Sequence, residues 1–179
     1  TDTENKPLLA AIWWDILMSE YRKKFAQYNK EVAGILVTHA DIEDYPSRRS
    51  ALQKTIFSAW NSGIIPIINE NDALSVEELD ALNRGWDNDQ NALLIAKMLE
   101  SRHIIFTTNT NGVYANPHDP TSRISEMKSH LLTPPYIQNL CGGKSTNGTG
   151  GMASKLQVAH QAWKHGISTH IGNGIDSGI

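Results

Sequence analysis

The chain has 179 residues, which fits one α/β domain, and 40% of them are hydrophobic, as in an ordinary globular protein. Its 16 Lys and Arg residues and 19 Asp and Glu residues give a net charge of −3, which excludes the basic surface that nucleic acids or anionic membranes require. The single cysteine, Cys141, excludes an internal disulfide, and because no signal-peptide pattern is visible we expect a cytoplasmic protein.

The first predicted element is a long amphipathic helix over residues 8–28. Apolar side chains recur along it at helical spacing, from Leu8 to Tyr28, and charged residues lie between them. Aromatic residues in such a pattern are far more often core residues than the lining of a ligand pocket, so we expect them to be buried.

Strands and helices then alternate along the chain. The sequence predicts strands over residues 33–37, 64–68, 103–107 and 167–171, and helices over residues 47–62, 87–100 and 151–164. Pro66 indicates that the second strand lies near a sheet edge or begins late. Pro134-Pro135 and Gly142-Gly143 predict that residues 126–144 are irregular. The alternation predicts an α/β fold with a mainly parallel sheet, and we find no boundary that divides the chain into two domains.

Four polar residues, Asn69-Glu70-Asn71-Asp72, directly follow the second predicted strand. The carboxyl ends of parallel strands are where open α/β sheets bind ligands. Asn and Asp also form turns by hydrogen bonding to their own backbone. On this segment alone, the turn is the favoured interpretation.

Asp87-Asn88-Asp89 stands at the start of the third predicted helix. Asp87 fits the N-cap position, yet one cap needs only one acidic side chain. The remaining oxygens and the amide could bind an ammonium group, orient a lysine or hold a metal ion. Capping alone and ligand binding both stay open for this segment.

A glycine-rich segment, residues 147–155, leads into the last predicted helix. Glycines let the backbone approach a phosphate, the helix start supplies N–H donors, and Lys155 adds a positive charge. The spacing differs from that of a Walker A loop, and a flexible linker that ends in an exposed lysine stays the alternative. Residues 106–114 follow the third strand and by themselves predict only a loop.

Taken in order, these segments resemble the glutamate 5-kinase branch of the amino-acid kinase family. The matching segments are Pro66–Asp72, Asp87–Asp89, Thr107–Asn109, Gly112–Tyr114, Gly148–Gln157 and Ile171–Gly174. The resemblance covers nearly the whole chain, and the ordered set is more specific than any one piece. It implies a partial amino-acid kinase domain over residues 1–179, with the three-layer α/β/α sandwich of that family, incomplete at the N-terminus.

The resemblance also implies a role for each motif. Asp72 and Asn88 would hold L-glutamate, with Asn69 in the same pocket, and Asp89 would orient the active-site lysines. The implied ATP-binding residues are Thr108, Asn109, Thr149, Gly150, Gly151, Met152, Ala153, Ser154 and Lys155, with Lys155 on the transferring phosphoryl group. Magnesium would bridge the phosphates of the co-substrate ATP, and no residue of the chain is expected to ligate a metal ion.

The implied activity is ATP-dependent phosphorylation of the γ-carboxylate of glutamate, the first step of proline biosynthesis. We expect a homo-oligomer that binds L-glutamate and ATP, and neither nucleic acid nor membranes. The family's first strand, with a catalytic lysine and a glycine-rich loop, has no match here, so we expect a chain that lacks its N-terminal part.

Two departures from the family pattern keep alternatives open. Asn109 stands where the family usually has Asp, and Trp13-Trp14 stands where it usually has Gly-Gln. One alternative is a degenerate, non-catalytic subunit that binds a nucleotide or a partner chain. The other is a kinase of the same fold that acts on a different acceptor.

Overall fold

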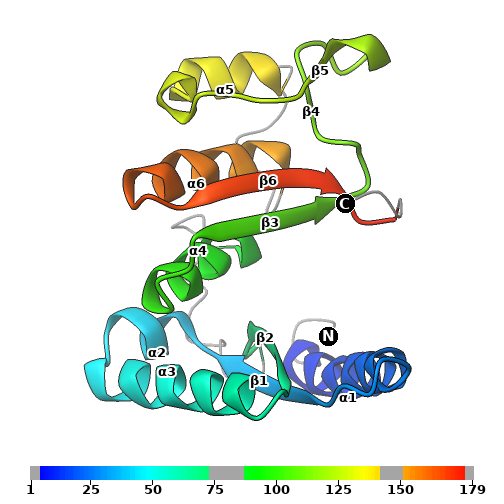
Figure 1. Ribbon diagram of the computed structural model, residues 1–179, viewed down its shortest axis with the longest axis vertical. Coiled ribbons are helices and arrows are strands. Elements are labelled where there is room, and N and C mark those ends of the chain that lie inside the picture. Colours follow the sequence, from blue (N-terminus) through cyan, green and yellow to red (C-terminus); the bar gives the residue numbers. More distant parts are fainter. Residues whose placement is uncertain (1–4, 73–86, 142–150, 176–179) are drawn as a thin grey trace. The chain divides into compact units, whose positions relative to one another are not determined.

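The computed structural model describes residues 5–72, 87–141 and 151–175. The chain divides into two compact units, residues 1–85 and residues 86–179 (Figure 1). Each unit has its own strands and helices, and the two are described in turn. The expected single domain over residues 1–179 stays a prediction.

The first unit is built on a pair of parallel strands, β1 (Val32–Val37) and β2 (Ile65–Glu70). The helices of this unit are α1 (Lys6–Ala26), α2 (His39–Glu43) and α3 (Pro46–Asn61). Two parallel strands cannot be joined by a tight turn, and α2 and α3 form the crossover between them. The predicted strands and helices of this unit are therefore confirmed, with α2 as an addition.

The aromatic side chains of the first predicted helix are not core residues. The prediction that they are buried was wrong for Trp13 and Tyr21 of α1 and for Tyr28, which follows the helix. Trp13 is 66% exposed, whereas Met18 is 2% exposed. The helix meets β1 along a narrow line, where Trp14 and Met18 lie against Gly34. The helix was predicted correctly, but its apolar residues are spread around it rather than gathered on one side, and β1 covers only the side that carries Trp14 and Met18.

The second unit contains the other parallel pair, β3 (His103–Thr108) and β6 (Ser168–Asn173). Helices α4 (Asn88–Met98) and α6 (Met152–Lys164) pack on one face of this pair, as Figure 1 shows. One cluster of buried residues joins α4, β3, α6 and the residue before β6: Leu93, Ala96, Ile104, Phe106, Val158, Ala162 and Ile167. Ile171 of β6 packs against this cluster. This core fixes the start of α4 relative to the start of α6, and the predicted elements are confirmed.

The segment predicted to be irregular, residues 126–144, contains a short helix, and a small hairpin precedes it. Strands β4 (Val113–Tyr114) and β5 (Arg123–Ile124) pair in the antiparallel sense. Helix α5 (Pro134–Leu140) begins at the double proline that was expected to break structure. Proline is well suited to the first helical turn, where the backbone N–H has no helical partner.

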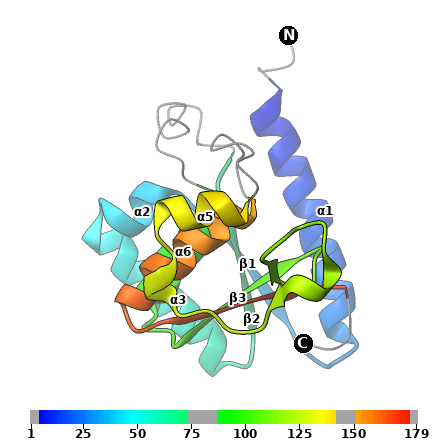
Figure 2. The same ribbon diagram turned by 90° about the horizontal axis from the view of Figure 1, so that it is seen from above.

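Helix α5 packs against α6 and closes a second core. The two helices lie close together in Figure 2, and Leu132, Ile137 and Leu140 meet Leu156 and Ala159 between them. Three-residue 3₁₀ turns at Pro120–Ser122 and Ser129–Leu131 connect β4, β5 and α5. This second layer carries one wall of the pocket described below.

The fold class is mixed α/β, and both longer strand pairs are parallel, as predicted. The strands of the described residues form three two-stranded sheets, so the continuous sheet of the expected three-layer sandwich stays a prediction. No helix in the described ranges has the length and apolar character needed to cross a membrane.

Candidate active site

The start of α4 is built around the Asp87 carboxylate. Its Oδ1 atom accepts hydrogen bonds from the backbone N–H groups of Asp89 and Gln90, each at 3.0 Å. This is the N-cap that the sequence predicted, and it satisfies two N–H groups that have no partner within the helix. The cap leaves Oδ2 of Asp87 and the whole carboxylate of Asp89 available for other contacts.

Asp89 and Lys155 form a buried ion pair. The Lys155 Nζ atom lies 3.1 Å from both carboxylate oxygens of Asp89, and the two side chains are only 14% and 10% exposed. The same ammonium lies 5.5 Å from the centre of the Phe106 ring, which contributes a cation–π attraction. Burial strengthens the attraction between the two charges but costs their hydration, so that each charge depends on the other for compensation.

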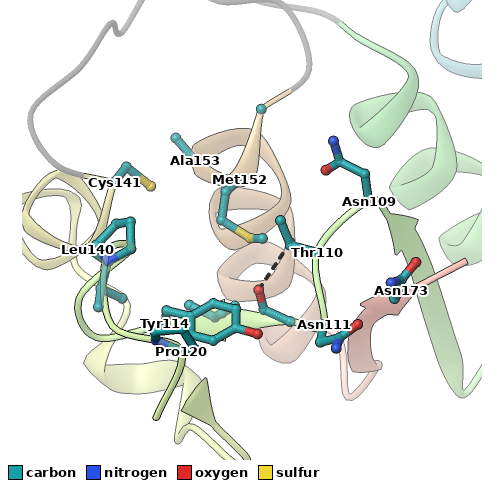
Figure 3. A pocket seen from close by; sticks show the side chains of 14 residues that line it. Asn109, Thr110, Asn111, Tyr114, Pro120, Leu140, Cys141, Met152, Ala153 and Asn173 are labelled. Carbon is teal, nitrogen blue, oxygen red and sulfur yellow. Dashed lines mark hydrogen bonds between the residues drawn. The ribbon is translucent and has the colours of Figure 1, made fainter. Parts of the chain in front are cut away.

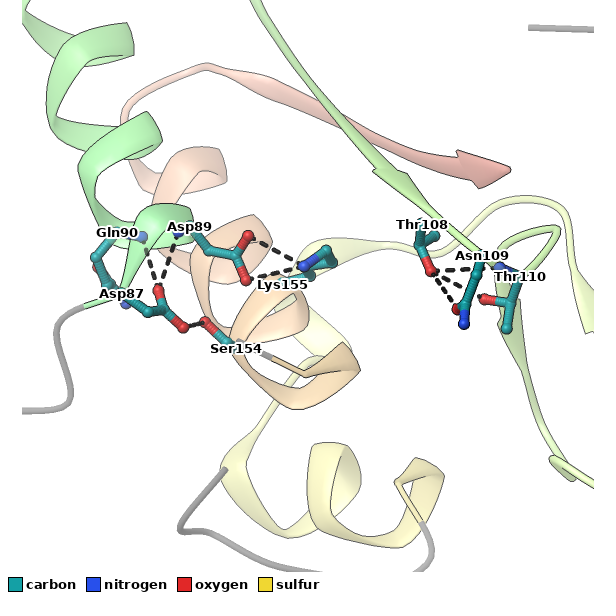
Figure 4. Close-up of polar contacts among 8 residues, drawn as sticks. All are labelled: Asp87, Asp89, Gln90, Thr108, Asn109, Thr110, Ser154 and Lys155. Carbon is teal, nitrogen blue, oxygen red and sulfur yellow. Dashed lines mark hydrogen bonds and ion pairs between the residues drawn. The ribbon is translucent and has the colours of Figure 1, made fainter. Parts of the chain in front are cut away.

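A second link joins the same two helices. The Ser154 hydroxyl donates a hydrogen bond of 2.5 Å to Oδ2 of Asp87. Figure 4 shows both links, with Asp87 and Asp89 on α4 facing Ser154 and Lys155 on α6. Asn88 lies between the two acidic residues and is exposed.

Beside the start of α6 lies a pocket of about 650 Å³, a size typical of small-molecule sites. Three amide side chains, Asn109, Asn111 and Asn173, lie on one side of it in Figure 3. The opposite side is formed mainly by apolar residues, among them Tyr114, Pro120, Leu140 and Met152. A flat heteroaromatic group with hydrogen-bonding edges suits such a pocket.

The pattern characteristic of the Amino acid kinase family matches residues 3–173 of the chain. This span covers most of both units and every residue of the geometry described above. The chain belongs to the amino acid kinase family. In this family member, the starts of α4 and α6 carry an ion pair whose two side chains are both largely buried.

Curated proteins similar to this amino acid kinase family member are named glutamate 5-kinase. The protein from Listeria welshimeri is 34% identical over 161 residues, which cover 89% of this chain and 58% of the relative. The proteins from Lactococcus lactis and Geobacillus thermodenitrificans are 34% and 36% identical, over 93% and 97% of this chain and 62% and 46% of theirs. The chain therefore spans about half the length of the relatives that it matches.

The structure brings together part of the predicted nucleotide-binding set of the family. Asn109, Gly151, Met152 and Ala153 line the pocket. Thr108 does not line it, but its hydroxyl donates a hydrogen bond of 3.3 Å to the Asn109 side chain. Ser154 and Lys155 face α4 instead, and Thr149 and Gly150 lie outside the described residues.

Several pocket residues were not assigned a role from the sequence. Tyr114 and Asn173 lie in segments that carry the family resemblance, which was the signal that could have identified them. Leu140 and Cys141 come from the end of α5, where the double proline suggested irregular structure. Burial raises the pKa of the Cys141 thiol, so this side chain is a neutral, weakly polar part of the wall.

The predicted glutamate-binding residues are divided between the two units. Asn69 is half-buried on β2, opposite Leu36 of β1, and Asp72 is exposed two residues after that strand ends. Asn88 belongs to the second unit. The meeting of these three side chains around one ligand stays a prediction for this family member.

Proposed function

We propose that the protein is an ATP-dependent kinase that phosphorylates the γ-carboxylate of L-glutamate to glutamyl 5-phosphate. This reaction is the first step of proline biosynthesis, and we assign the protein to the cytoplasm as a homo-oligomer. The observation that carries the proposal is the buried pair between Asp89 and Lys155 at the start of α6, next to a pocket of nucleotide size.

The nucleotide fits the pocket as follows. The adenine ring lies among Tyr114, Leu140 and Met152, and the amides of Asn109, Asn111 and Asn173 meet the polar edge of the nucleoside. The phosphates extend toward Gly151, where the first turn of α6 offers free N–H groups and the positive end of the helix dipole. Within the described residues, that turn has no acidic side chain that would repel them.

Lys155 is the catalytic residue for the phosphoryl group in this proposal. Phosphoryl transfer requires in-line positioning and neutralisation of charge, with little covalent work by the protein. Asp89 holds the Lys155 ammonium at 3.1 Å, so the charge is already oriented before the substrates bind. A lysine held in this way helps a negatively charged carboxylate approach a triphosphate.

Magnesium enters as part of the nucleotide substrate and supplies further positive charge between the phosphate oxygens. Within residues 5–72, 87–141 and 151–175, no three His, Cys, Asp or Glu side chains gather to hold a metal ion. The carboxylates nearest the site are engaged by Ser154, by Lys155 and by the N–H groups of α4. In this proposal the metal is held by phosphate oxygens rather than by the chain.

Glutamate is assigned as the acceptor because the similar curated proteins carry that name and because the chain has suitable side chains. An amino acid presents an ammonium group and a carboxylate, and Asp72 provides the opposite charge for the ammonium. Asn88 and Asn69 provide amides for the carboxylate.

The first test compares two lysines of α6. The purified protein is given ATP, magnesium and L-glutamate, ADP release is followed by a coupled assay, and the acyl phosphate is trapped with hydroxylamine. Lys155→Met should lower kcat by about 10²–10³-fold, the usual effect of removing a group that stabilises transition-state charge. Lys164→Met, at the exposed end of the same helix, is the matched control and should leave kcat unchanged.

Each alternative predicts a different result in this assay. A different amino acid that replaces glutamate as the required acceptor would favour a kinase of other specificity. If calorimetry shows nucleotide binding but no acceptor gives turnover, a degenerate subunit is favoured. Asn109 in place of the usual Asp is the residue that motivates this alternative. Equal kcat values for wild type and Lys155→Met would contradict the role of Lys155.

A further inference from the structure

A single carboxylate, that of Asp87, joins the starts of two helices. One of its oxygens accepts hydrogen bonds from the backbone N–H groups of Asp89 and Gln90 and so caps α4. The other accepts the hydroxyl of Ser154, which is 67 residues away in the sequence and lies in the first turn of α6. Figure 4 shows the two oxygens directed at different helices.

Few polar contacts fix the start of α6 at this end. Within the described residues, no side chain caps α6, and Gly151 at its N-cap position offers no side chain for the purpose. Met152 and Ala153 pack against the second core but stay partly exposed, and the buried residues of the helix begin at Leu156. The contact between Ser154 and Asp87 therefore holds the first turn of α6. Gly151, Met152 and Ala153, which precede Ser154 in the chain, line the pocket.

The neighbouring ion pair between Lys155 and Asp89 does not fix the position of the α6 backbone in the same way. A lysine side chain has four rotatable bonds, so Lys155 can keep its ammonium on Asp89 while the backbone of α6 shifts. A serine side chain has one such bond, so its hydrogen bond fixes the position of the backbone itself. Because Ser154 and Lys155 are neighbours in the chain, fixing the former also fixes the base of the latter.

We propose that Asp87 and Ser154 are positioning residues, whose hydrogen bond holds the first turn of α6 so that Lys155 and the free N–H groups meet the phosphates at a fixed spacing. This inference rests on the proposed function. Asp87 and Ser154 do not themselves contact the reacting atoms. Their effect passes through the backbone of α6 to Lys155 and to the pocket wall at Gly151.

The test begins with the nucleotide-free protein and uses hydrogen–deuterium exchange. Ser154→Ala should raise exchange in the peptide over residues 152–157 by up to about tenfold, the ratio that corresponds to one hydrogen bond to a charged group. The peptide over residues 158–164 should be unchanged, because the buried core holds it. Ser154→Thr keeps the hydroxyl and should restore protection, and Ser58→Ala, at an exposed position of α3, is the matched control.

The second measurement is nucleotide affinity by calorimetry, together with kcat. Ser154→Ala should weaken ATP binding and lower kcat, each by about three- to tenfold, and Ser154→Thr should recover both. Asp87→Asn retains a good N-cap, so α4 should stay intact while the link to Ser154 weakens. If the two residues act through one contact, the double variant should lose no more affinity than the more affected single variant.

The outcomes separate the inference from the proposed function. Wild-type protein that binds no nucleotide would overturn the proposed function, and the positioning role with it. If Ser154→Ala binds nucleotide as tightly as the wild type, only the inference is overturned. The same holds if the losses of the two single variants multiply in the double variant. A purely structural role would lower the unfolding temperature of Ser154→Ala while leaving its ATP affinity and kcat at the wild-type values.

Discussion

Helices α1 and α6 are both rich in apolar residues but have opposite surroundings. In α6 these residues gather on one side of the helix, whereas in α1 they are spread around it. In α6 the apolar residues Leu156, Val158, Ala159 and Ala162 are all buried, and Val158 and Ala162 have no exposed surface. In α1, Met18 alone among the described side chains is buried, and Leu8, Leu9, Ile12, Trp13, Ile16 and Leu17 are all exposed.

The difference lies in the neighbours as well as in the distribution of the apolar residues. Helix α6 is covered by β6, α4 and α5, which reach it from different directions, so a wide apolar face is filled. Helix α1 packs mainly on β1, and a strand is narrower than the apolar face of a helix. Periodicity predicts which side of a helix is apolar, but it says nothing about how much of that side the rest of the chain covers.

The largest expected contrast is between one leucine from each helix. Leu156→Ala should lower the free energy of unfolding by about 3 kcal/mol, because Leu156 is 2% exposed and its removal leaves a cavity between α5 and α6. Leu9→Ala makes the same chemical change where the side chain is 49% exposed, and should cost less than about 1 kcal/mol. Urea unfolding followed by circular dichroism measures both.

The same pair of variants can break the comparison. If Leu9→Ala destabilises the protein as much as Leu156→Ala does, the apolar side of α1 is covered in solution. An equal effect that depends on protein concentration would further indicate that a second copy supplies the cover. The expected result is a small effect at Leu9 that is independent of concentration.

A second variant, Gly34→Ala, tests the contact between α1 and β1. A Cβ atom at Gly34 would lie 2.9 Å from Cζ2 of Trp14 and 3.1 Å from Cε of Met18. Gly34→Ala should therefore destabilise the protein by about 1–2 kcal/mol, because a buried contact must shift. Urea unfolding of Gly34→Ala measures the effect directly.

Trp14→Leu supplies the control for this clash. The smaller side chain frees the space that the new methyl group needs, so adding Gly34→Ala to Trp14→Leu should cost less than adding it to the wild type. Equal costs in the two backgrounds would show that α1 does not pack on β1 through Trp14.

The sequence predicted best those elements whose signal is repeated along their own length. The bounds of α3, α4, α6, β3 and β6 agree with the expected ranges to within a few residues. Strands β4 and β5 have two residues each, too few to carry any periodicity, and they depend on each other across a loop. Helix α5 was missed because Pro134-Pro135 has two meanings, a break within a helix or the start of one.

In the site, too, contacts between residues close in the sequence were easier to predict than contacts between distant ones. The cap by Asp87 could be predicted because it involves residues two and three positions ahead. The pairing of Asp89 with Lys155 was expected only through the family resemblance, since 66 residues separate them. The link from Ser154 to Asp87 was not predicted, because a serine near a helix start has many possible partners until the helices pack.

The two helices also end in the same way, with one residue different. After α6, the Ile167 N–H donates to the Ala162 carbonyl at 3.0 Å, and Gly166 has a φ of 73°. After α1, the Lys30 N–H donates to the Phe25 carbonyl at 3.1 Å, and Asn29 has a φ of 53°. Positive φ is natural for glycine and strained for residues with a Cβ atom, although asparagine tolerates it better than most.

Exchanging the residue type at these two ends gives the smallest expected effects and opposite signs. Gly166→Ala should lower the free energy of unfolding by about 1 kcal/mol, because no atom lies within 4 Å of the new Cβ and the cost is conformational alone. Asn29→Gly should raise it by a few tenths of a kcal/mol at most, because glycine removes the strain but gives the unfolded chain more freedom. Thermal and urea unfolding of each variant against the wild type measure the shifts. A gain at Gly166→Ala, or a loss above about 1 kcal/mol at Asn29→Gly, would mean that the shared hydrogen-bond pattern does not govern how these helices end.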